Sequence, residues 1–88
     1  MSANKTSSES RESMTPEDAF GRIVRERRLA LGLTQAEIEG EEIMERSYIS
    51  RLEAGHYQVC LRGILHLAKA LKMSSAELME QVERKLAE

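Results

Sequence analysis

The chain has 88 residues, with 13 Lys and Arg against 15 Asp and Glu and a formal net charge of -2 at pH 7. This length allows one small domain, and the near balance of charge excludes a general electrostatic attraction to nucleic acid, so a basic binding surface would have to be local. One Phe, two Tyr and no Trp leave Leu, Ile, Val, Met and Ala to fill the core, which favours an all-α bundle of short helices over a β-sandwich or barrel.

The N-terminal stretch MSANKTSSESRESMT is rich in Ser and shows no apolar period. Residues 1–15 are therefore predicted to be a disordered arm, and residues 16–88 the folded domain. The single Cys60 has no internal disulfide partner, and no apolar stretch is long enough for a signal peptide or a membrane span. We expect a cytoplasmic protein without membrane association.

The first two of five expected helices have clear start signals. In TPED, residues 15–18, a capping residue precedes Pro16, and two acids lie near the positive end of the helix dipole. Gly32 is the expected end of this helix. TQAE, residues 34–37, is a capping box that opens a short second helix.

The third helix lies in MERSYISRLEAG, residues 44–55, and is expected to stop at Gly55. At about 100° per residue, Ile49 and Leu52 form one apolar edge. Ser47, Ser50 and Arg51 point away from that edge. An outward face of small hydroxyls and Arg is suited either to water or to reading a ligand.

The last two helices show apolar periods of three and four residues. Leu61, Ile64, Leu65, Ala68 and Leu71 mark the fourth helix. SSAE, residues 74–77, is a second capping box, and it opens a fifth helix whose apolar positions are Leu78, Met79, Val82 and Leu86.

Three motifs at matching spacing give the sequence a specific resemblance. GRIVRERRLALGLTQAEI, RSYISRLEAG and ILHLAKAL, all within residues 20–79, resemble the Cro/repressor-like, or XRE-type, family of bacterial and phage regulators. The resemblance implies a five-helix lambda-repressor-like bundle that contains a helix-turn-helix and binds double-stranded operator DNA as a homodimer.

The resemblance also implies roles for particular residues. Gln35 takes the place of a family residue that touches a phosphate and braces the recognition helix. Arg28 and Glu53 take the places of a structural ion pair. Glu53 lies near the buried edge of the third helix, and an acid there needs such a partner. The residues expected to contact DNA, as base readers or backbone contacts, are Gln35, Arg46, Ser47, Tyr48, Ser50, Arg51, His56 and Tyr57, with Gln58 beside them.

Helix 5 is amphipathic and runs almost to the end of the chain. Part of its apolar face is expected to pack against a second copy, as the resemblance implies, and the residues assigned to this dimer interface are Leu78, Met79, Val82 and Leu86.

The turn before the third helix departs from the family pattern. Ile43 stands where the family has Gly, and a β-branched residue is poorly suited to positive φ. Either the second helix ends early at Gly40, or Ile43 takes an ordinary conformation in a reshaped turn. Glu45 precedes the reading turn, where it can cap the helix or accept from a cytosine amine.

The leading hypothesis is a sequence-specific transcription regulator, of repressor or controller type, that binds an inverted repeat. The alternative is an antitoxin-like or other protein-interaction module with weak DNA binding, which would use the acidic second-helix region or helix 5. An enzyme is not expected, since no paired carboxylates, nucleophile with base or phosphate-binding loop appears. His56, Cys60 and His66 lack metal-ligand spacing, and neither a cofactor nor a small-molecule ligand is expected.

Overall fold

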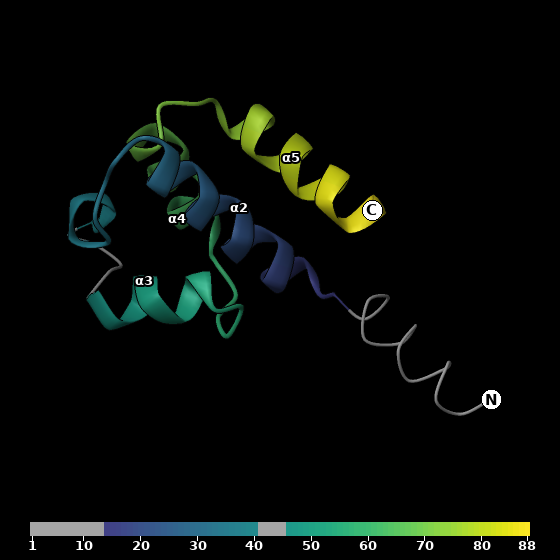
Figure 1. Cartoon of the computed structure of the whole chain (residues 1–88), viewed down its shortest axis with the longest axis horizontal. Helices are drawn as coiled ribbons and strands as arrows, with labels where there is room; N and C mark the ends of the chain where they lie inside the picture. Colours follow the sequence, from purple (N-terminus) through teal and green to yellow (C-terminus); the bar gives the residue numbers. More distant parts are fainter. Residues whose placement is uncertain (1–13, 41–45) are drawn as a thin grey trace.

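The computed structural model describes residues 14–40 and 46–88, the latter without the side chains of residues 46 and 47. Within these residues the chain forms four α-helices and one 3-10 turn, and no strand (Figure 1). The elements are α2 (Pro16–Ala30), the turn η1 (Ala36–Ile38), α3 (Arg46–Glu53), α4 (Leu61–Ala70) and α5 (Ser75–Ala87). The all-α prediction is confirmed, and the predicted disordered arm lies almost wholly outside the described residues.

The ends of α2 follow from local sequence. Thr15 and Asp18 form a capping box, in which the Asp18 amide donates to the Thr15 hydroxyl at 3.0 Å and the Thr15 amide donates to the Asp18 carboxylate at 3.1 Å. At the other end, Gly32 has φ 73°, and the amide of Leu33 donates to the carbonyl of Arg28 at 3.0 Å. This Schellman arrangement, which needs a left-handed residue, stops the helix where the sequence predicted.

The predicted second helix is shorter than expected. The capping box of Thr34 and Glu37 forms, with bonds of 2.8 and 3.2 Å, but the helical turn ends at Ile38. Glu39 is extended, with φ -67° and ψ 154°. The carbonyl of Ile38, which a longer helix would bond to one of its own later amides, lies 3.0 Å from Nε2 of His66 instead. The helical conformation therefore ends before Gly40, and the five-helix count is not confirmed; Ile43 and Glu45 lie outside the described residues.

Helix α2 is the element on which the others assemble. It crosses the molecule between α3 and α5, and α4 packs against α5 and η1 (Figure 1). Gly21 lets α2 approach the end of α3, since a Cβ there would lie 2.8 Å from the Glu53 carbonyl oxygen. The buried apolar core consists of Ala19, Phe20, Ile23, Val24, Ile38, Ile49, Leu52, Leu67, Ala68, Leu71, Leu78 and Val82.

Two of the four residues assigned to the dimer interface lie in the core of the monomer. Leu78 and Val82 are 0% and 3% exposed, because the side of α5 that carries them packs against α2 and α4. Met79 and Leu86 are 37% and 39% exposed and remain accessible on the same helix.

Candidate nucleic-acid interface

Helix α3 separates a fully buried edge from an exposed one. Ile49 and Leu52 have no exposed surface, whereas Ser50 and Arg51 are exposed. This division matches the 3.6-residue period read from the sequence. The buried pair fixes α3 on the core, and Ser50 and Arg51 project from the opposite side.

A buried ion pair joins the end of α3 to α2. The Nε and Nη2 atoms of Arg28 donate to the two carboxylate oxygens of Glu53, at 2.6 and 2.9 Å. The two residues are only 7% and 8% exposed. Chiefly through the hydrogen bond to Glu53, the pKa of the Arg28 guanidinium is raised above its ordinary value. The bidentate geometry is the strong form of this contact and fixes direction as well as distance.

The same network includes the connection that precedes α3. Gln35 donates through Nε2 to Oε1 of Glu53 at 3.1 Å, and Nη1 of Arg28 donates to the carbonyl of Leu33 at 2.9 Å. Glu53 therefore ties three segments together. Gln35 contacts α3 as a brace would, and its contact with a phosphate stays a prediction.

An aromatic cluster lies beside the exposed side of α3. The hydroxyl of Tyr57 lies 2.6 Å from Nη1 of Arg51, and the guanidinium carbon lies 5.5 Å from the centroid of the Tyr57 ring. Tyr48 packs on Tyr57 with ring centroids 5.0 Å apart, and its hydroxyl donates to the carbonyl of Gln58 at 3.4 Å. Chiefly by burial, the pKa of the Tyr48 phenol is raised above its ordinary value.

Separate roles were predicted for Tyr48, Arg51 and Tyr57, and no contact between them was predicted. Tyr48 and Tyr57 are nine positions apart, with the end of α3 between them. Their approach depends on the direction the chain takes after Gly55, whose φ is 84°. The only local signal was that one Tyr of the chain lies in α3 and the other lies four residues after its end.

Of the remaining predicted contact residues, some are exposed and others have side chains that the structure does not describe. His56 and Gln58 are exposed in the segment after α3. Arg46 and Ser47 form the first turn of α3, but their side chains lie outside the described part of the structure. Their proposed role as base readers therefore stays a prediction.

The arginines of α2 divide between surface and structure. Arg22 and Arg25 are exposed. Arg27 instead donates to the carbonyl oxygens of Leu71 and Lys72, at 2.9 and 3.3 Å. Those carbonyls end α4, where Lys72 has the left-handed φ of 60°. Arg27 thus caps the C-terminal end of α4. The spacing of residues within α2 gives no indication of this role.

Cys60 and His66 have local structural contacts. Cys60 is the N-cap of α4, and its sulfur accepts from the amide of Gly63 at 3.4 Å. His66 contacts the end of η1. In the described residues, no three His, Cys, Asp or Glu side chains gather as metal ligands, and no described helix is long and apolar enough to cross a membrane.

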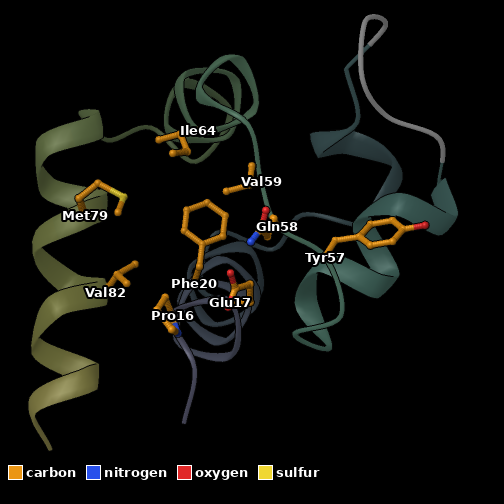
Figure 2. Close-up of a pocket in the computed structure, with 9 residues that line it drawn as sticks. All are labelled: Pro16, Glu17, Phe20, Tyr57, Gln58, Val59, Ile64, Met79 and Val82. Atoms are coloured by element: carbon orange, nitrogen blue, oxygen red, sulfur yellow. The ribbon is translucent and has the colours of Figure 1, made fainter. Parts of the chain in front are cut away.

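A small apolar pocket of about 170 Å³ lies on the α5 side of α2. Figure 2 shows Phe20 at its centre, with Met79 and Val82 of α5 facing it. Tyr57 borders this pocket but points away from Phe20, toward the α3 side. The pocket is smaller than the cavities of roughly 300–1,000 Å³ that enclose drug-sized ligands.

Comparison with known proteins agrees with this geometry. Residues 19–81 match the family of helix-turn-helix domains. The fold is similar to the clp gene regulator ClgR from Corynebacterium glutamicum, with a TM-score of 0.76 and 25% identity over 83% of this chain and 78% of that one. It is also similar to the restriction-modification controller protein C.AhdI from Aeromonas hydrophila, with a TM-score of 0.64 and 39% identity over 70% of this chain and 94% of that one.

Comparison with curated protein sequences gave no match. The family match nevertheless covers both sides of the helix-turn-helix and most of the described residues. This protein therefore belongs to the helix-turn-helix domain family, as the XRE-type resemblance of its sequence predicted.

Proposed function

We propose that this protein is a DNA-binding transcription regulator, of repressor or controller type, that binds an inverted-repeat operator as a homodimer. The observation that carries the proposal is the fixed position of α3. Its inner edge is fully buried, and its end is held by the Arg28–Glu53 pair. Its other side presents Ser50 and Arg51 outward, and side chains of these types recognise base edges and phosphates in the major groove.

The relatives named above support the regulatory part of the proposal. One is titled a gene regulator and the other a controller protein. A homodimer would place two copies of α3 in successive major grooves, about 34 Å apart. Met79 and Leu86 are the exposed apolar residues of α5 that we assign to the contact between copies.

Selection of random duplex DNA by the purified protein tests the proposal. The selected sequences are then titrated at two salt concentrations, because phosphate contacts weaken as salt rises and base contacts carry the specificity. We expect an inverted repeat with half-sites one helical turn apart. Arg46→Ala and Arg51→Ala should each weaken operator binding by about 1–3 kcal/mol and bind random DNA almost as the unaltered protein does.

A second candidate function is a protein-interaction module with weak DNA binding. Leu61 and Leu65 lie one turn apart on α4 and are 72% and 53% exposed, which is typical of a surface that contacts another protein. No enriched motif, together with binding that disappears at moderate salt, would favour this candidate over an operator reader.

A further inference from the structure

Arg51 is held in one direction although it is exposed. Its Nη1 lies 2.6 Å from the Tyr57 hydroxyl, and its guanidinium carbon lies 5.5 Å from the centroid of the same ring. A long surface side chain ordinarily samples many rotamers and loses that freedom on binding. A contact that selects one direction beforehand reduces this loss.

Tyr57 is itself fixed by neighbours. Its ring packs on Tyr48 at 5.0 Å between centroids, and the Tyr48 hydroxyl is bound to the Gln58 carbonyl at 3.4 Å. Figure 2 shows the Tyr57 side chain turned away from Phe20 and Val59, which line the pocket next to it. The Tyr57 ring, whose hydroxyl contacts Arg51, is therefore held by neighbouring side chains.

No carboxylate in the described part of the structure neutralises Arg51. Among the described residues, Arg51 forms no ion pair within 4.0 Å, unlike Arg28, which pairs with Glu53. A neutral phenol orients a guanidinium without cancelling its charge. A guanidinium has five N–H donors, so one bond to Tyr57 leaves a pair for the O6 and N7 acceptors of guanine.

We infer that Tyr57 is a positioning residue, which orients Arg51 for a bidentate contact with a guanine in the operator. This inference rests on the proposed function. It gives Tyr57 a task different from the backbone contact expected from its place in the sequence, because its hydroxyl is engaged by a side chain of α3. The specificity of Arg51 then depends on a residue outside the recognition helix.

A double-mutant cycle on the selected operator tests the inference. The variants are Tyr57→Phe, Arg51→Ala and the double variant, and Glu26→Gln is the control because Glu26 pairs with Lys85 of α5 and has no contact with α3 among the described pairs. Each is titrated on the operator, on the operator with the assigned guanine replaced, and on random DNA.

Tyr57→Phe should weaken operator binding about threefold to tenfold, the range for loss of one hydrogen bond. It should have little effect on random DNA, and no further effect when Arg51 is already Ala. Preference for guanine at one position of each half-site should fall. Glu26→Gln should keep that preference, and all variants should keep their far-ultraviolet circular dichroism.

Three results would overturn the inference. An equal loss from Tyr57→Phe in the Arg51→Ala background would mean that the hydroxyl meets DNA directly. An equal loss on random DNA would mean a phosphate contact, and unchanged binding would mean that the Tyr57 contact does not orient Arg51. These results differ from failure of the proposed function, in which the unaltered protein itself selects no operator and both proposals fall together.

Discussion

The buried pair of Arg28 and Glu53 leads to the sharpest stability prediction. Replacing Arg28 by Met keeps much of the side-chain volume but removes the bidentate partner of a carboxylate whose side chain is only 3% exposed. Glu53 would then keep its bond from Gln35 and lose both bonds from Arg28. Breaking a buried pair in this way costs about 3–5 kcal/mol, because one charge is left buried without compensation.

That cost is large for a chain of this size. A typical free energy of unfolding for 88 residues is about 4–13 kcal/mol, so Arg28→Met should remove about a quarter of it or more. The double variant Arg28→Met/Glu53→Leu removes both charges together. It should cost about 1–4 kcal/mol, from the Leu33 carbonyl and the Gln35 amide that lose their partners, which is well below the sum of the two single losses.

Urea unfolding followed by circular dichroism measures these differences. At a slope of about 1 kcal/mol per M, a loss of 3 kcal/mol lowers the midpoint by about 3 M. All variants are measured in the same concentration of a stabilising osmolyte, so that the weakest still has a folded baseline. Glu26→Gln is the matched control, since the Lys85–Glu26 pair is 3.3 Å long with Glu26 62% exposed, and an exposed pair contributes less than about 1 kcal/mol.

The result that would refute this reasoning is additivity. If the double variant lost as much as the two single variants together, the pair would have no coupling energy, and the close contact would not stabilise the fold. A loss below about 1 kcal/mol for Arg28→Met would likewise show that water reaches Glu53 when its partner is removed.

Three further predictions test other contacts. Gly21→Ala should destabilise the fold by about 1–3 kcal/mol in urea unfolding, because its Cβ would meet backbone oxygen of α3, including that of Glu53 at 2.8 Å; a gain, as at an ordinary helical Gly, would contradict this packing. Because the folded pKa of Tyr48 is raised, its share of stability should be complete below pH about 10 and be lost as pH rises through the folded value. The difference between alkaline absorbance titrations of the unaltered protein and Tyr48→Phe should therefore have a midpoint above about 10, and a lower midpoint contradicts it. Met79→Asp should leave the chain folded and lower the sedimentation mass if α5 joins two copies, whereas Leu78→Asp should unfold the monomer because Leu78 is fully buried; an unchanged mass for Met79→Asp would remove Met79 from the interface.

The sequence predicted those features that depend on neighbouring residues. The capping boxes that begin with Thr34 and Ser74 form as expected, and Gly32 and Gly55 follow the ends of their helices. These signals act within a few residues, so a reading of local sequence contains the necessary information. The contact between Arg28 and Glu53 was suggested by the family resemblance and a near-buried acid.

Contacts that depend on the path of the chain were missed or misassigned. An apolar period on α5 shows that one face is buried but not what buries it, so Leu78 and Val82 were assigned to a dimer although they lie in the monomer core. The end of the second helical turn at Ile38 was not predicted, because the His66 side chain that contacts the Ile38 carbonyl comes from a position 28 residues away. The contact of Tyr57 with Arg51 was not predicted, because it depends on the direction that the chain takes after Gly55.

Two consecutive residues of α2 hold two different helices. Arg27 binds the carbonyls that end α4, and Arg28 binds the carboxylate near the end of α3. Adjacent helical positions diverge by about 100°, so one residue inserted between Gly21 and Arg27 would turn both arginines away from their partners at once. The position of α3 relative to α4 is therefore sensitive to the residue count of α2, and a change of length that a surface loop would absorb would here displace the proposed reading helix.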